Sequence, residues 1–216
     1  MTRLVLASAS PARREVLRSA GIEPVVMVSD VDEDAVAAAL PAGTPPQVVV
    51  IELARAKAES VAAGSITSKA GGLGSDCVVV GCDSMLSVDG ELQGKPHTPE
   101  VARARWADMA GRSADLITGH CVLRVREGRI VGSAVDCSST TVHFAKPEPE
   151  ELNAYIDSGE PLAVAGAFTL DGRGGWFVDR IEGDPSSVIG IGLPLLRRLL
   201  GDVGVGIAHL WAHSPD

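Results

Sequence analysis

The feature that most constrains the fold is a short apolar run followed directly by a well-capped helix near the N-terminus. Leu4–Ala7 places four apolar residues in a row, which is typical of a short buried strand. Ser10 is a favourable N-cap, Pro11 suits the first position of a helix, and Gly21 suits the residue after its end. This strand, turn and helix predict an α/β fold.

The rest of the chain alternates apolar runs with helical stretches. Strands are predicted at Val25–Ser29, Cys77–Cys82, Leu116–Val125, Arg129–Phe144 and Trp176–Ile181, with hairpin turns at Asp89-Gly90 and Glu127-Gly128. Helices are predicted at Gln47–Ala63, between Thr98 and Gly111, at Pro149–Asp157 and at Pro194–Leu200, and a disordered loop at Gly64–Ser75. This order of elements predicts a mixed sheet flanked by helices.

Composition argues against several classes of protein. The 216 residues suit one large domain, and with 45% apolar but only 3% aromatic residues the core must consist mainly of Val, Leu, Ile and Ala. Acidic residues outnumber basic ones 28 to 19, and the resulting net charge of −9 argues against binding nucleic acid or an anionic membrane. No stretch approaches the roughly 18 apolar residues of a membrane span, and Leu4–Ala7 is too short for a signal-peptide core.

The cysteines indicate a reducing compartment. Cys77, Cys82, Cys121 and Cys137 show no CxxC spacing and lie mostly in apolar runs that resemble strands. Buried thiols are therefore expected rather than disulfides or a metal site. Together with the absence of a targeting segment, this predicts a cytoplasmic protein.

The turn before the first helix can bind a phosphate group. The N-terminus of a helix presents unpaired N–H groups and a partial positive charge, both of which favour an anion. Ser8 and Ser10 add hydroxyl groups, and Arg13 and Arg14 place two cations in the first turn. The same residues also fit a surface helix that merely begins with a Ser-Pro cap, so these local features leave both interpretations open.

A second candidate site follows the apolar run Cys77–Cys82, where Asp83 is expected at the end of a buried strand. Ligands of open α/β sheets bind at this end of the strands, and Mg²⁺ typically takes one or two carboxylates together with phosphate oxygens. An aspartate that only caps a turn gives the same pattern. Lys57 on a predicted helix and Lys95 between Gly and Pro are the candidate basic partners.

Short motifs occur in a fixed order along nearly the whole chain. They are Leu6–Pro11 with Arg13 and Leu17, Ser29–Glu33, Leu53–Ala58, Gly81–Asp83, Gly94–Pro96, Met109–Arg112, Thr118-Gly119, Tyr155, Gly159–Pro161, Ala165–Ala167, Ile181–Asp184, Val188–Gly190 and Leu193–Leu195. In this order they resemble the Maf family of nucleoside triphosphate pyrophosphatases. The joint order is far more specific than any single motif.

The resemblance implies both a fold and an activity. The implied fold is a single α/β domain over residues 1–216, with an elongated mixed sheet, two lobes and a central cleft, related to the inosine triphosphate pyrophosphatases and often a homodimer. The implied activity is hydrolysis of the α–β phosphate bond of a nucleoside triphosphate, with Mg²⁺ or Mn²⁺, to a monophosphate and pyrophosphate. Two alternatives stay open: a phosphatase that releases orthophosphate, and a non-catalytic nucleotide-binding regulator of septum formation.

The resemblance also assigns roles to residues. It implies that Asp83 accepts a proton and that Glu33 is a second acidic residue of the site, and we expect these two carboxylates to hold the metal. The triphosphate-binding set comprises Ser8, Ser10, Arg13, Lys57 and Lys95. We therefore expect the three cations to share one pocket with Asp83 facing it. The positions that match specificity residues of the dTTP and UTP branch are Ala12, Ser84 and Asp171. That branch has Arg, Thr and Gln there, and the chain matches neither it nor the 7-methyl-GTP branch, so the preferred base is not predicted.

Overall fold

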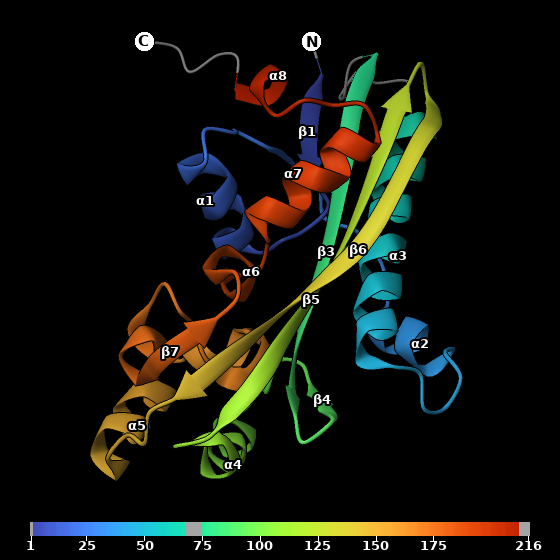
Figure 1. The fold of residues 1–216 in the computed structure, drawn as a ribbon. Helices are drawn as coiled ribbons and strands as arrows, with labels where there is room; N and C mark the ends of the chain where they lie inside the picture. Colours follow the sequence, from blue (N-terminus) through green and yellow to red (C-terminus); the bar gives the residue numbers. More distant parts are fainter. Residues whose placement is uncertain (1, 68–74, 212–216) are drawn as a thin grey trace.

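The computed structural model describes residues 2–67 and 75–211, and within them seven strands form one mixed sheet flanked by helices (Figure 1). The strands are β1 (Arg3–Leu6), β2 (Val25–Val26), β3 (Asp76–Val88), β4 (Glu91–Gln93), β5 (Ser113–Arg126), β6 (Arg129–Phe144) and β7 (Val178–Glu182). The helices are α1 (Pro11–Ser19), α2 (Glu33–Ala38), α3 (Pro46–Thr67), α4 (Pro99–Met109), α5 (Pro149–Asp157), α6 (Pro185–Ile189), α7 (Leu193–Asp202) and α8 (Ala208–Trp211). This architecture confirms the predicted α/β class.

The sheet combines a parallel part and a longer antiparallel part. Its order is β2-β1-β3-β5-β6-β7, with β4 paired to β3 outside this path. Strand β1 runs parallel to β2 and β3, whereas β3, β5, β6 and β7 pair antiparallel. The long strands β3, β5 and β6 form the centre of the sheet, and β1, β4 and β7 pair with them (Figure 1).

Strand β3 contributes to two separate cores because successive side chains of a strand point to opposite faces. Val78, Val80 and Cys82 pack with the apolar residues of α1 and α7 on one face. Cys77 and Val79 pack beneath α3 on the other face. Figure 1 shows α3 on one side of the sheet and α1 and α7 on the opposite side.

A third hydrophobic cluster lies at the far end of the sheet, where α4 and α5 cover it. Its centre is the fully buried Trp106, whose ring meets Phe144 edge to face with centroids 5.7 Å apart. The indole N–H of Trp106 donates to the carbonyl of Ala167 at 2.8 Å, which satisfies the one polar atom of this side chain. The division of the fold into two lobes with a cleft between them stays a prediction.

Two glycines let α3 lie directly on the sheet. A Cβ atom at Gly81 would stand 2.1 Å from the carbonyl oxygen of Ala54, and one at Gly119 would stand 2.2 Å from that of Val50. Such distances are far inside van der Waals contact, so a side chain at either position would force the helix away. This close approach brings the next turn of α3, which carries Lys57, against β3.

The structure corrects several predicted boundaries. The strand predicted to stop before Asp83 continues to Val88, because β5 remains paired with it from Asp76 to Ser87. The strand predicted at Val25–Ser29 covers only Val25–Val26, since its neighbour β1 ends there. Trp176 lies in a 3₁₀ helix, Arg173–Phe177, and β7 begins after it.

Two further boundaries differ in the N-terminal half. The acidic segment after Ser29 contains a short helix, α2, that was not predicted, and Asp32 caps it by accepting from the N–H of Ala35. Helix α3 extends to Thr67, into the segment predicted as a loop, and residues 68–74 of that segment lie outside the described residues. The predicted hairpin turns, α1, α4 and α5 are confirmed.

The cysteines and helices agree with the expectations from composition. All four cysteines are free thiols, and Cys77, Cys82 and Cys121 are buried while Cys137 is half-buried. Burial raises the pKa of Cys82 to about 11 and that of Cys121 to about 12, so these thiols are protonated at neutral pH. Among the helices in the described ranges, each is too short or too polar to cross a lipid bilayer.

Candidate functional site

The predicted residues gather at an interruption in one edge of β3. Strand β5 pairs with the other edge of β3 along nearly its whole length. On this edge, β1 pairs with β3 only as far as Val80, and the pairing of β3 with β4 starts at Leu86. Within the described part of the chain, residues 81–85 therefore have no strand neighbour on this side. Ser8 follows β1 at one end of the interruption, and Lys95 follows β4 at the other. Asp83 lies in its centre.

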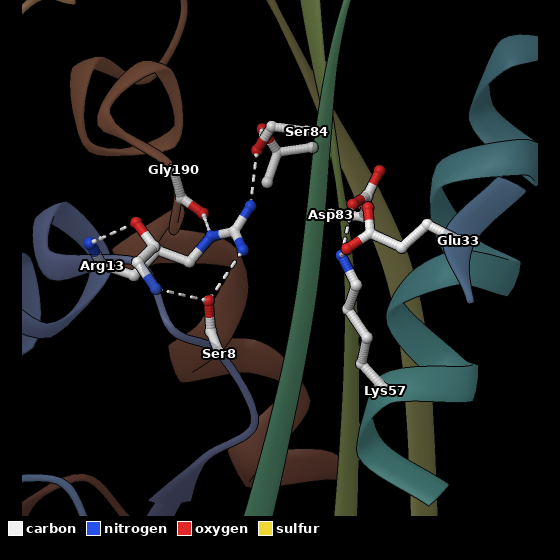
Figure 2. Close-up of polar contacts among 9 residues, drawn as sticks. Ser8, Arg13, Glu33, Lys57, Asp83, Ser84 and Gly190 are labelled. Atoms are coloured by element: carbon white, nitrogen blue, oxygen red, sulfur yellow. Dashed lines mark hydrogen bonds and ion pairs between the residues drawn. The ribbon is translucent and has the colours of Figure 1, made fainter. Parts of the chain in front are cut away.

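On the α1 face, Arg13 is held by three acceptors from three parts of the chain (Figure 2). Its guanidinium donates to Ser8 Oγ at 3.1 Å, to Ser84 Oγ at 3.2 Å and to the carbonyl oxygen of Gly190 at 2.8 Å. All three acceptors are neutral, and no ion pair of Arg13 occurs among the residues that the structure describes. The side chain is thus fixed in position while its positive charge is left unneutralised.

The turn between β1 and α1 is organised by its two serines. Ser10 accepts from the N–H of Arg13 at 3.4 Å, which confirms the predicted N-cap. Ser8 is buried and also accepts from the N–H of Ser10 at 3.2 Å. Arg14 instead turns outward to an ion pair with Glu23, so only one of the two candidate arginines reaches the site.

On the α3 face, Lys57 bridges two carboxylates (Figure 2). Its Nζ lies 2.6 Å from Asp83 Oδ1 and 2.9 Å from Glu33 Oε1. Asp83 and Lys57 are 5% and 7% exposed, whereas Glu33 at the start of α2 is open to solvent. The second oxygen of Asp83, Oδ2, is buried and has no hydrogen-bond partner. An unpartnered carboxylate oxygen at such depth is unfavourable unless a ligand, water or metal completes it.

The charges of this site act on one another across β3. Burial raises the pKa of Asp83, and the positive charges of Lys57 and Arg13 oppose that shift. Burial also tends to raise the pKa of Glu33. The hydrogen bond and charge of Lys57, with the charges of Lys95 and Arg13, outweigh burial and lower this pKa below its ordinary value. The three cations therefore share one electrostatic environment around the two carboxylates.

The arrangement differs from the single pocket that the sequence predicts. Asp83 and Ser84 are successive residues of β3, so Asp83 points to α3 and Ser84 to α1. Figure 2 shows Arg13 and Ser8 on one side of β3, and Lys57 and Glu33 on the other. The structure thus pairs Lys57 directly with Asp83, whereas Arg13 influences Asp83 only through its charge.

The remaining predicted residues lie around this centre. Lys95 is exposed and reaches the acidic pair only through its charge on Glu33. Ala12 is half-buried beside Arg13 in α1, and Ser84 contacts Arg13 directly. Asp171 is exposed in the segment between two 3₁₀ helices of the far end of the sheet.

Of two cavities in the described part of the chain, one lies near these elements and the other does not. One of ≈ 300 Å³ opens beside the turn formed by Ser8, Ser10 and Pro11, and its lining includes Arg14 and Arg18 but not Arg13. A larger one of ≈ 470 Å³ lies at the far end of the sheet, between Tyr155 and Trp176, and includes none of the predicted site residues. We therefore place the site at the interruption of β3, on the geometry of its charged groups.

Reasoning from sequence gave no role to a set of buried polar residues on β5. Thr118 hydrogen-bonds Ser84 at 3.0 Å, and His120 Nε2 accepts from the N–H of Gly192 at 2.9 Å. The other ring nitrogen of His120 therefore carries the proton and donates to the Thr118 carbonyl at 3.1 Å. Burial lowers the pKa of His120 to about 4, so it is neutral at pH 7. Thr118 belongs to the motif Thr118-Gly119, one of those that carry the family resemblance, but nothing in a single sequence shows that it contacts α6.

Comparisons with known proteins identify the family of this chain. A family model described as Maf-like protein matches residues 3–203. A protein of Nocardia farcinica (strain IFM 10152) named nucleoside triphosphate pyrophosphatase is 80% identical over 210 residues, which cover 97% of each chain. One of the same name from Rhodococcus jostii (strain RHA1) is 68% identical over 214 residues, covering 99% of this chain and 98% of that protein. The chain therefore belongs to the Maf family.

Proposed function

We propose that this chain is a nucleoside triphosphate pyrophosphatase, which hydrolyses the bond between the α- and β-phosphates and releases a monophosphate and pyrophosphate. Family membership and the names of the relatives support this activity. The observation that carries it is an arginine fixed by neutral acceptors at a helix N-terminus, next to a buried carboxylate. Transfer of a phosphoryl group depends mainly on positioning and on neutralisation of charge, and this site has the groups for both.

Arg13 and the N-terminus of α1 are the proposed binding site for the triphosphate. A guanidinium fork can bind phosphate oxygens at two points, and an Arg that already has an anionic partner would first have to give it up. The partial positive charge at the start of α1 adds to this attraction. Lys95, which is exposed at the other end of the interruption, is placed to neutralise further charge on the phosphates.

Asp83 is the proposed general base. A base that works near neutral pH needs a pKa above that of an ordinary aspartate, and burial shifts Asp83 in this direction. Its Oδ2 atom has no partner in the protein and can accept a proton from the attacking water. Lys57 holds the other oxygen, Oδ1, and so fixes the orientation of the carboxylate.

Asp83 and Glu33 fit a divalent metal such as Mg²⁺ or Mn²⁺. Both carboxylates lie within ion-pair distance of one point, the Lys57 ammonium group, so the two side chains converge and would hold the metal together. No group of three or more His, Cys, Asp or Glu side chains could hold a metal in the described part of the chain, so phosphate oxygens would have to complete the coordination. A bound metal would supply positive charge to the phosphates and to the leaving pyrophosphate.

The test of this function is to identify the product. The purified chain, given a panel of ordinary and modified triphosphates with Mg²⁺ or Mn²⁺, should release pyrophosphate and a monophosphate. Release of orthophosphate would establish a phosphatase instead, and binding without turnover would establish a nucleotide-responsive regulator. The same panel determines which base the chain prefers.

The Asp83→Asn variant tests the catalytic assignment within this assay. We expect kcat to fall by about 10²- to 10⁴-fold, the usual contribution of a positioned base, while nucleotide binding persists. Removal of divalent metal from the wild-type protein with a chelator should also stop turnover. Near-normal turnover in a correctly folded Asp83→Asn variant would show that the carboxylate is structural.

The location is an expectation from the sequence, and the assembly is one from the family. The proposed substrates are metabolites of the cytoplasm, where we expect the chain to act, without nucleic acid or membrane as a partner. A homodimer is the expected assembly. Cell fractionation and sedimentation velocity test these two expectations separately from the activity.

A further inference from the structure

Behind Arg13 lies a chain of hydroxyl groups that begins on β3 and ends at α6. Ser84 Oγ lies 3.0 Å from Thr118 Oγ1, and Thr118 donates to the carbonyl oxygen of Ser187 at 3.2 Å. Thr118 has no exposed surface, so water is in no position to replace these bonds. The chain joins three elements that are distant in sequence, β3, β5 and α6.

The direction of these hydrogen bonds follows from their end point. A carbonyl oxygen can only accept, so the single proton of Thr118 is committed to Ser187. Thr118 can then only accept from Ser84, which commits the single proton of Ser84 in turn. The oxygen of Ser84 therefore presents only lone pairs to Arg13, whose Nη2 donates to it at 3.2 Å. Every bond points away from the guanidinium, and hydrogen bonds aligned in this way strengthen one another.

Thr118 also fixes the segment that carries a second acceptor of Arg13. Ser187 belongs to α6, and Gly190 directly after this helix accepts from Arg13 Nε at 2.8 Å. The bond from Thr118 to Ser187 thus holds to β5 the same short helix that positions the Gly190 carbonyl. The third acceptor, Ser8, does not depend on Thr118.

We propose that Thr118 is a positioning residue for triphosphate recognition, which acts by orienting Arg13 through Ser84 and α6. Of the three acceptors that hold the guanidinium, Thr118 orients Ser84 directly and helps to hold the segment that carries Gly190, although Thr118 itself does not touch Arg13. This role rests on the proposed function, in which Arg13 binds the triphosphate. It predicts that loss of one buried hydroxyl weakens binding of the substrate more than it slows the chemical step.

The isosteric variant Thr118→Val removes the hydroxyl group and keeps the shape. We expect KM for the preferred triphosphate to rise about 10-fold with kcat changed less than about 3-fold, because a binding interaction is lost. Thr118→Ser, which keeps the hydroxyl group, should restore KM. Thr141→Val is the control: its hydroxyl also joins two strands, donating from β6 to Asp115 of β5 at 2.6 Å, but among the described residues it makes no hydrogen bond to Ser84 or α6. Its KM should stay within about 2-fold of wild type.

A double-mutant cycle with Arg13→Lys decides whether Thr118 acts through Arg13. If it does, Thr118→Val should add little to the defect of Arg13→Lys; a further 10-fold rise in KM would overturn the proposal. If Thr118→Val does not fold, Ser84→Ala tests the same series of hydrogen bonds. An unchanged KM in Ser84→Ala would also overturn the proposal. Binding of inorganic triphosphate measured by calorimetry gives the same comparisons without turnover. A wild-type protein that binds triphosphate but does not hydrolyse nucleotides would refute the proposed function, while the Kd values would still test Thr118.

Discussion

The two faces of β3 hold their charged residues in opposite ways. On the α1 face, two hydroxyl groups and a carbonyl fix Arg13 and leave its charge unneutralised. On the α3 face, Lys57 is held by two carboxylates within 3 Å, and its charge is already neutralised. An anion can therefore bind Arg13 without displacing a partner, whereas Lys57 would have to leave Asp83 or Glu33 first.

This difference assigns distinct tasks to the two faces. Neutral acceptors orient a cation at little electrostatic expense, so the α1 face suits recognition of phosphate. A buried ion pair adds little net stability, because the cost of removing both charges from water offsets their attraction, but it fixes the geometry of the two groups. The α3 face therefore suits the orientation of a catalytic carboxylate. Lys57, which the sequence suggested as a phosphate ligand, contacts Asp83 and Glu33 in the structure.

The largest effect should follow loss of the buried cation. Lys57→Met leaves Asp83 buried without its partner, and we expect the free energy of unfolding to fall by about 3–5 kcal/mol at pH 8. The deficit should shrink in acid, because protonated Asp83 needs no cation. Urea denaturation at pH 5 and pH 8 measures the deficit and its dependence on pH. The exposed Lys146→Met is the control, and a deficit below about 1 kcal/mol in Lys57→Met would show that the ion pair contributes little.

On the α1 face we expect geometry to matter more than charge. Arg13→Lys keeps the positive charge but loses the guanidinium fork that bonds Ser8, Ser84 and Gly190. We expect kcat/KM for the triphosphate to fall about 30-fold, which corresponds to about 2 kcal/mol. Arg14→Lys, whose parent side chain pairs with Glu23 at the surface, should change it less than 2-fold. Equal values for both variants would show that any cation in this turn suffices.

How much of this could be predicted from sequence depends on the distance between the interacting residues. Local signals were sufficient for α1, since Ser10, Pro11 and Gly21 mark its ends within one short segment. They were misleading at Asp83, because the strand continues only through its pairing with β5, which is encoded more than 30 residues later. The choice of Arg13 over Arg14 depends on Gly190, which lies 177 residues away, and no local pattern contains that contact.

The close approach of α3 explains how the acidic face is assembled, and it can be tested by adding one methyl group. Gly119→Ala would place Cβ 2.2 Å from the carbonyl of Val50, so we expect a loss of about 1–3 kcal/mol of stability as α3 is pushed from the sheet. Turnover should fall with it, because Lys57 moves away from Asp83. Gly201→Ala in α7 meets nothing within 4 Å and should be neutral or stabilising. Thermal unfolding separates these outcomes, and equal shifts in Tm would contradict the tight contact.

The smallest expected effect comes from a comparison of two carboxylates of β3, Asp76 and Asp83. At the start of β3 the hydrogen bond from Arg124, aided by Thr2 and Arg126, lowers the pKa of Asp76 to about 2. A lowered pKa means that ionised Asp76 stabilises the fold above about pH 4, and that this stability is lost as the pH falls toward 2. Asp76→Asn should therefore cost about 1–2 kcal/mol at pH 7, discounted for its partial exposure, and nothing near pH 2.

Asp83 has its pKa shifted the other way, so the deficit of Lys57→Met should develop at higher pH than that of Asp76→Asn. Unfolding free energies of the two variants between pH 3 and pH 8 test this separation. If both deficits develop over the same pH range, the burial of Asp83 does not set its ionisation, and the contrast between the partly exposed pair of Asp76 and Arg124 and the buried pair of Asp83 and Lys57 is wrong.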